Sequence, residues 1–211
     1  MQALFSPDSK FMQAMSRLFD LVLLNFLFLL TCLPVFTIGA AATALYTCCF
    51  QISQERGILK SYFRAFRESF RQSTLLWLIL LLCGGSALFN LMLFRNMGGV
   101  MGFLAIPFGI LLALAVLTGS CAFPLTSRFS NDLKTTIKNA LLLSLGYLPR
   151  FALLAFLNVF PLIVFFTDIY VFFQTGFIWI TIYFSFSAYV GTLLLKKVFA
   201  PYLPPEECET E

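Results

Sequence analysis

Long apolar segments recur along this chain, and short basic stretches separate them. A helix that crosses a bilayer needs about 20 mainly apolar residues, because each residue adds about 1.5 Å across a core of about 30 Å. Of the 211 residues, 60% are hydrophobic and only 11% are charged, whereas about 25% are charged in soluble domains. So few charged groups cannot cover a surface that faces water. We therefore predict an all-α fold, a polytopic bundle of membrane helices.

The apolar segments predict about six transmembrane helices, which lie at 18–36, 37–52, 73–94, 100–123, 150–167 and 176–195. The second segment is short for a crossing and rich in Gly and Ala, so whether it crosses fully stays open. We expect residues 1–200 to form a single transmembrane domain. Residues 201–211 hold three prolines and four glutamates, a composition that predicts a disordered acidic tail in the cytoplasm.

The positions of lysine and arginine predict the orientation of the bundle. If the N-terminus is inside, one side holds Lys10, Arg17, Arg56, Lys60, Arg64, Arg67, Arg71, Arg128, Lys134, Lys138, Arg150, Lys196 and Lys197. The other side then holds Arg95 alone. Because cytoplasmic loops carry the excess of basic residues, this distribution predicts a multi-pass protein of the bacterial plasma membrane with both termini in the cytoplasm.

The most charged internal stretch, 60–72, predicts a cytoplasmic amphipathic helix after the second crossing. Helical spacing gives it a basic stripe and an adjacent aromatic row, formed by Lys60, Arg64, Arg67 and Arg71 and by Phe63, Phe66 and Phe70. One interpretation is an anchor for lipid headgroups. The other is a docking surface for a protein partner. We expect no nucleic-acid partner, because the basic residues lie beside apolar segments rather than in one soluble domain.

The junction between the first two predicted helices is the most distinctive stretch of the chain. Its residues of interest are Pro34, Thr37, Gly39 and Thr43. Two polar residues inside apolar segments, Asn25 and Asn90, are considered with them. Small residues spaced four apart let helix backbones approach closely in a membrane. Alternatively, the proline and glycine leave an unwound segment whose backbone groups bind a solute, as in transporters with broken helices. Both interpretations stay open at this point.

Groups that carry out catalysis are scarce in the sequence. The chain has no histidine, and its six cysteines include no C-x-x-C pair. Intramembrane catalysis needs titratable groups that converge, and no pair of carboxylates has helical spacing inside an apolar segment. We therefore expect no enzyme activity, no catalytic residue, no cofactor and no metal site. The sequence does not reveal the oligomeric state.

Two groups of residues resemble the YesL family of bacterial membrane proteins. The first group comprises Arg17-Leu-Phe-Asp20, Asn25, Leu33-Pro34-Val35, Thr37-Ile38-Gly39-Ala40 and Thr43-Ala44-Leu45-Tyr46, and the second comprises Phe63-Arg64-Ala65-Phe66, Phe70-Arg71-Gln72 and Leu76-Trp77. The resemblance covers the first 80 residues specifically and the remainder only in hydropathy and length. Members of that family commonly sit beside genes for sugar ABC-type importers and sensor kinases, which implies a part in carbohydrate uptake. No catalytic residues are assigned in that family, so the resemblance implies none here.

Two functional hypotheses follow. The first is a non-enzymatic inner-membrane protein that acts as an accessory or regulatory partner of a carbohydrate uptake system of the ABC type. Its partners would be the lipid bilayer and another membrane protein, such as a sugar importer subunit. The alternative is a small-solute transporter or channel whose site lies near the break between the first and second helices.

Overall fold

The computed structural model describes residues 10–52, 57–95, 99–129 and 131–199, and every regular element in these ranges is a helix. The all-α prediction is therefore confirmed for the described residues. The predicted acidic tail, 201–211, lies outside them, as does the start of the chain.

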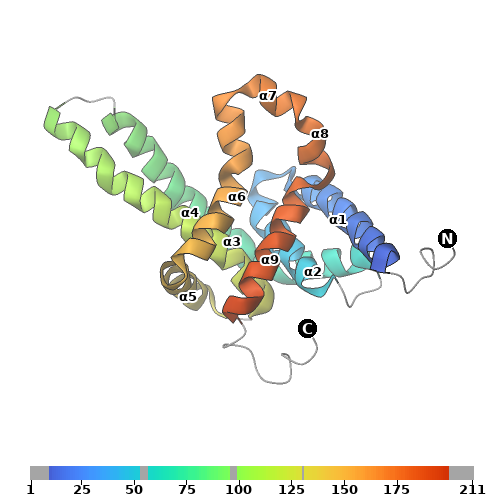
Figure 1. Ribbon diagram of the computed structural model, residues 1–211. Helices are drawn as coiled ribbons and strands as arrows, with labels where there is room; N and C mark the ends of the chain where they lie inside the picture. Colours follow the sequence, from blue (N-terminus) through green and yellow to red (C-terminus); the bar gives the residue numbers. More distant parts are fainter. Residues whose placement is uncertain (1–9, 53–56, 96–98, 130, 200–211) are drawn as a thin grey trace.

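The helices follow one another with short connections (Figure 1). They are α1 (Lys10–Cys32), the 3-10 turn η2 (Val35–Thr37), α2 (Ile38–Gln51), α3 (Ile58–Arg95), the 3-10 helix η3 (Gly99–Leu104), α4 (Ala105–Arg128), α5 (Leu133–Gly146), α6 (Leu148–Thr167), α7 (Ile169–Gln174), α8 (Gly176–Ile178), the π-helix η4 (Trp179–Tyr183) and α9 (Phe184–Phe199).

Within the described ranges, five segments are helical, long and apolar enough to cross a membrane. They are Met15–Cys32, Ile58–Arg95, Gly102–Arg128, Leu148–Thr167 and Gly176–Phe199. Val35–Gln51 is a sixth apolar helical stretch, but it is shorter than these. Its α-helical part, α2, has 14 residues and so is about 21 Å long. The chain has the helices of a multi-pass membrane protein, and six crossings stay a prediction.

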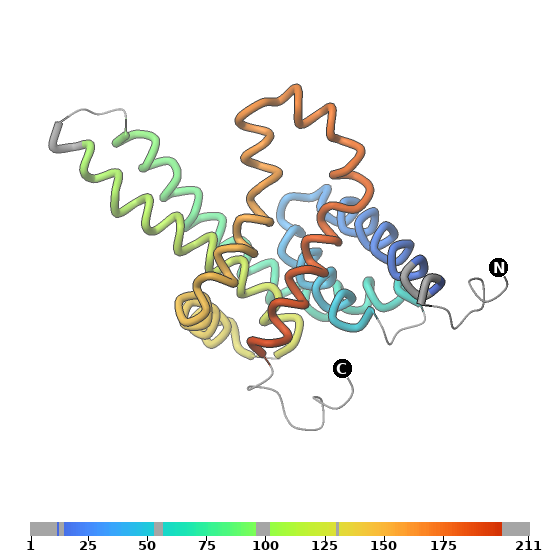
Figure 2. The backbone as a smooth tube through the Cα atoms, in the orientation of Figure 1, coloured from blue at the N-terminus to red at the C-terminus, as the bar shows by residue number. Residues whose placement is uncertain are grey.

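The long helices form hairpins, which Figure 2 shows as a continuous path. Helices α3 and α4 form one hairpin that projects to the upper left of the view, and α6 and α9 form another, closed by α7 and α8 (Figure 1). Helix α2 packs against α1, α3, α4 and α9, and ten of its 14 residues are buried. The centre of the bundle is therefore built around the shortest of the apolar stretches.

The small residues of α2 explain how it fits there. A Cβ atom added at Gly39 would overlap the carbonyl oxygen of Ser73 and would lie 2.6 Å from the Cβ of Trp77, both on α3. Ala40, Ala41 and Ala44 are fully buried as well. Small side chains let backbones approach closely, which is the main source of helix association in lipid. This contact supports the close-packing interpretation of the junction.

Three predicted boundaries differ from the structure. Helix α1 begins at Lys10 rather than at residue 18, and it ends at Cys32, two residues before Pro34, because proline disfavours helical geometry in the residue before it. The predicted amphipathic helix 60–72 is helical and runs directly into the predicted crossing 73–94, so that the two form one helix, α3, which begins at Ile58. The connection between the predicted crossings 150–167 and 176–195 contains a helix, α7, whose first backbone N–H groups donate to the Asp168 carboxylate.

Candidate functional site: a basic and aromatic surface on α3

The first four turns of α3 carry the candidate site. We call it the basic-aromatic surface, and it consists of Lys60, Phe63, Arg64, Phe66, Arg67, Phe70 and Arg71. All four cationic side chains are exposed, as is Phe63, while Phe66 and Phe70 are half-buried. The seven residues predicted for this site therefore lie on one helix, with the cations toward the outside.

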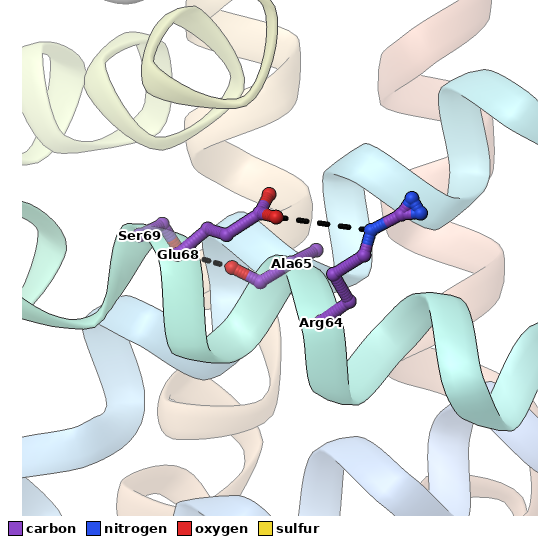
Figure 3. Close-up of polar contacts among 4 residues, drawn as sticks. All are labelled: Arg64, Ala65, Glu68 and Ser69. Atoms are coloured by element: carbon purple, nitrogen blue, oxygen red, sulfur yellow. Dashed lines mark hydrogen bonds and ion pairs between the residues drawn. The ribbon is translucent and has the colours of Figure 1, made fainter.

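One acidic side chain accompanies the cations. Glu68 lies 3.7 Å from Arg64, measured from Oε1 to Nε (Figure 3). Both side chains are largely exposed, 73% and 64% respectively, and a surface ion pair of this kind contributes about 0–1 kcal/mol. The same close-up shows Ser69 donating to the Ala65 carbonyl at 2.8 Å. The ion pair is thus weak, and the segment keeps a net positive charge for a partner.

The aromatic rings form a row beside the cations. The rings of Tyr62 and Phe66 stack with centroids 6.5 Å apart, and Phe66 meets Phe70 edge to face at 5.5 Å. Phe63 meets Tyr62 edge to face at 5.9 Å but stays 47% exposed. A hollow of about 500 Å³ opens between the three phenylalanine rings and the side chains of Arg67, Glu68 and Arg71. A partner would therefore meet apolar rings and guanidinium groups together.

Tyr62 anchors this part of α3 to the bundle. Its side chain is fully buried, and its hydroxyl lies 2.7 Å from the Thr31 hydroxyl and 3.5 Å from the Ala41 carbonyl oxygen. Thr31 belongs to the last turn of α1, and Ala41 to the first turn of α2. The basic-aromatic surface is therefore presented from a helix that is fixed to the α1–α2 turn.

Two further contacts fix α3 one turn beyond the surface. The hydroxyls of Ser73 and Thr43 are 2.8 Å apart, and the Trp77 indole N–H donates to the Val35 carbonyl at 2.9 Å. Trp77 lies 18 residues before the end of α3, which is about 27 Å of helix. The α1–α2 turn thus packs against the first half of α3, and the second half extends beyond it.

The structure brings together only part of the predicted solute site. Thr37, Gly39 and Thr43 lie near one another, and their polar groups are paired internally. The Thr37 hydroxyl donates to the Pro34 carbonyl at 2.7 Å, and the Thr43 hydroxyl donates to the Gly39 carbonyl at 3.1 Å. The Thr37 hydroxyl thus serves a backbone carbonyl at the break beside Pro34, where a membrane offers no water.

Asn25 and Asn90 lie elsewhere. Asn25 is fully buried, and its Nδ2 donates to the carbonyls of Trp179 and Ile180 at 3.1 and 2.6 Å. Its Oδ1 accepts the backbone N–H of Ser185 at 3.1 Å. The Asn25 side chain therefore supplies hydrogen bonds to backbone groups in and next to η4, where π-helical geometry interrupts the regular α-helical hydrogen bonds. Asn90 donates only to Ser86 of its own helix, about 25 Å along α3 from Ser73.

The sequence singled out neither Thr31 nor Tyr62 as a contact, and it indicated Trp77 only through the resemblance to the YesL family. All three have polar atoms that join α3 to the α1–α2 turn. The available signal was a hydroxyl or an indole N–H inside an apolar stretch, since such a group needs a partner in lipid. Among the described residues, no group of three His, Cys, Asp or Glu side chains could hold a metal ion.

Comparison with known proteins gives one match. Residues 21–91 match a family described as "Protein of unknown function, DUF624". That range covers α2, the basic-aromatic surface, and most of α1 and α3. A search of curated proteins gave no match, and a search of solved structures also gave none. The match therefore coincides with the part of the chain that builds the candidate site.

Proposed function

We propose that this protein is a non-enzymatic membrane protein that binds another membrane protein through the basic-aromatic surface. The partner would be a subunit of a carbohydrate importer of the ABC type, and the chain would act as its accessory or regulator. The observation that carries the proposal is the combination of four exposed cations and a row of rings on one anchored helix. Arginine and aromatic side chains are the residues most enriched where proteins bind tightly.

The rigidity of the site supports docking. A side chain that is already ordered loses less conformational freedom on binding, and rigid surfaces therefore bind more strongly for the same contacts. Tyr62 is held by Thr31 and Ala41, and Ser73 is held by Thr43. Apart from Lys60, the surface lies between these two anchored positions. An anchor for lipid headgroups alone would not need such a fixed geometry, because headgroups adapt to a mobile helix.

The choice of partner rests on the resemblance to the YesL family. The residues that carry the resemblance extend from Arg17 to Trp77, and the match at 21–91 covers most of them. A role beside sugar importers is what that resemblance implies. The matched range includes every residue of the basic-aromatic surface, which supports an assignment of function to this segment rather than to the later helices.

We further propose that the basic-aromatic surface and both termini face the cytoplasm. Thirteen basic residues on one side against Arg95 on the other support this orientation. Six crossings require α2 to pass from one side to the other. Its length of about 21 Å would suffice only if the bilayer is thin around it or the neighbouring helices cover its ends.

Photo-crosslinking in native membranes tests the proposal. Phe63, which is exposed, is replaced by p-benzoylphenylalanine, and the adducts are identified by mass spectrometry. We expect an adduct with a permease subunit of a sugar ABC importer. The triple substitution Arg64→Gln, Arg67→Gln and Arg71→Gln should reduce that adduct severalfold, because charge complementarity steers the encounter.

A matched control removes the same charge elsewhere. Arg95→Gln, Lys134→Gln and Lys197→Gln together lower the net charge by three but leave the basic-aromatic surface intact. This variant should keep the adduct. If only lipid is crosslinked, or if both triple variants lose the importer equally, the surface is not the docking site.

The alternative, a small-solute transporter, is tested by a separate experiment. The polar groups at the α1–α2 junction are engaged in internal hydrogen bonds, which gives this alternative less support than the docking proposal. Purified protein in liposomes should take up or bind a sugar if the alternative is right. If the protein neither takes up nor binds a sugar, the transporter alternative is wrong. That result would leave the docking proposal unaffected.

A further inference from the structure

A second hollow lies away from the basic-aromatic surface. A pocket of about 400 Å³ opens between the end of α4, the length of α5 and the end of α9. Leu125, Phe129, Leu142 and Phe199 give it apolar walls, and the rings of Phe129 and Phe199 meet edge to face at 5.7 Å. Its volume lies in the range of about 300–1,000 Å³ that small-molecule sites have.

Two carboxamides give the pocket polar groups without partners. Asn131 and Asn139 both line it and are half-buried. The Asn131 backbone carbonyl accepts from Gln72, but neither asparagine side chain forms a hydrogen bond within the described ranges. Apolar walls with a few free polar groups are the usual composition of a ligand pocket.

The surroundings of the pocket are strongly cationic. The segments that form it, 125–150 and 195–199, contain six Lys and Arg residues and one acidic residue, Asp132. Lys138 precedes Asn139 and is exposed. The Arg150 guanidinium lies 5.6 Å from the ring centre of Tyr147, which also lines the pocket. A ligand with a negative group would therefore be attracted to this end of the bundle.

Helix α5 suggests where the pocket sits relative to lipid. With 14 residues, it is about 21 Å long and too short to cross a bilayer core. Lys134 and Lys138 are exposed on its first half, and Leu142 and Leu145 are 59% and 47% exposed on its second half. Exposed leucines beside exposed lysines are typical of a helix that lies at the bilayer surface. A pocket beside such a helix would open where headgroups meet acyl chains.

From this geometry we infer that the pocket binds one anionic phospholipid. The headgroup phosphate would lie at the Asn139 carboxamide, and Lys138 and Arg150, which neighbour lining residues without lining the pocket themselves, would supply the positive charge. The start of an acyl chain would lie against Leu142 and Phe199. The inference is independent of the proposed docking function, because it uses α4, α5 and α9 rather than α3.

Native mass spectrometry of the purified full-length protein tests it. Phosphatidylglycerol and phosphatidylcholine with the same acyl chains are offered in equal amounts, and the bound lipid is counted. We expect one phosphatidylglycerol to be retained about tenfold more than phosphatidylcholine, since each nearby Lys or Arg attracts an anionic lipid. Lys138→Gln with Arg150→Gln should remove this preference.

Two further variants separate charge from shape. Leu142→Trp fills the pocket without changing the charge, and it should lower the retention of both lipids. Lys60→Gln with Arg64→Gln removes two charges from the basic-aromatic surface and should leave the retained phosphatidylglycerol unchanged. Size-exclusion profiles show whether each variant is folded. If the variant with both substitutions is not folded, Lys138→Gln alone takes its place. The inference would be overturned if the unaltered protein retained the two lipids equally. It would also be overturned if the Lys60→Gln, Arg64→Gln variant lost phosphatidylglycerol as much as the Lys138→Gln, Arg150→Gln variant.

Discussion

Helix α2 and the outer half of α3 are both strongly apolar, yet their surroundings differ completely. Ten of the 14 residues of α2 are buried, whereas Ala87 is the one buried residue of α3 beyond Leu76. Leu82 and Phe89 in the outer half are 69% and 65% exposed. Apolar character therefore does not decide which helix is central when lipid is the solvent.

Side-chain size and hydroxyl groups explain the difference. Helix α2 contributes Gly39, Ala40, Ala41 and Thr43 to its contacts, and these allow backbone approach and hydrogen bonds between helices. The outer half of α3 consists mostly of Leu, Phe and Met, and its small residues at 83–86 are exposed or half-buried. The contrast teaches that small residues matter where another helix packs directly against them, and it predicts which substitutions are costly.

The largest effect is expected at Gly39. Gly39→Leu should destabilise the protein by about 3 kcal/mol or more, because the new side chain would overlap the Ser73 backbone and Trp77. The matched variant is Gly85→Leu in α3, where an added Cβ meets nothing within 4 Å. Thermal unfolding in detergent, followed by size-exclusion chromatography, measures both. If the two variants unfold at the same temperature, the contrast between the two regions is wrong.

Asn25 should give the next largest effect. Asn25→Leu keeps a similar volume but leaves the Ser185 N–H and the carbonyls of Trp179 and Ile180 without their partner. An unsatisfied buried group costs about 1–3 kcal/mol, so we expect a loss of about 2 kcal/mol. Asn90→Leu, in the exposed region, should change stability by less than about 0.5 kcal/mol. The same unfolding assay compares them, and a larger loss at Asn90 would contradict the account.

The hydroxyl pair of Thr43 and Ser73 should give the smallest energetic effect. A double-mutant cycle with Thr43→Val and Ser73→Ala should yield a coupling of about 0.6 kcal/mol, the average for hydrogen bonds between membrane helices. Pairing Thr43→Val with Ser86→Ala supplies the control, because these residues do not touch and their effects should add. Equal coupling in the two cycles would show that the 2.8 Å contact contributes nothing specific.

Much of the fold follows from hydropathy alone. The long apolar segments predicted α3, α4, α6 and α9 as helices, since a chain in lipid must pair its backbone groups internally. The short helix α5, Leu133–Gly146, lies between two of these segments and is too short to be detected as a crossing. Helix starts were harder to predict, because α1 begins about two turns before the apolar segment at 18–36.

The candidate site was only partly predictable. The spacing of Arg64, Arg67 and Arg71 placed them on one helix, because helical geometry is local. The partners of Asn25 were not predictable, since Trp179 and Ser185 are more than 150 residues away along the chain. The same reason applies to Tyr62 and Thr31. Contacts between distant segments depend on how helices pack, and one sequence without its structure does not specify that.

Labelling of single cysteines in intact cells tests the central claim most directly, namely that the basic-aromatic surface faces the cytoplasm from a membrane bundle. Arg67→Cys and Arg95→Cys are each placed in a background whose native cysteines are replaced by alanine. A thiol reagent that cannot cross the bilayer should label the Arg95→Cys variant from outside. It should label the Arg67→Cys variant only after the cells are permeabilised. Labelling of the Arg67→Cys variant in intact cells would contradict the orientation. It would also contradict the proposal that a partner binds the basic-aromatic surface from the cytoplasmic side.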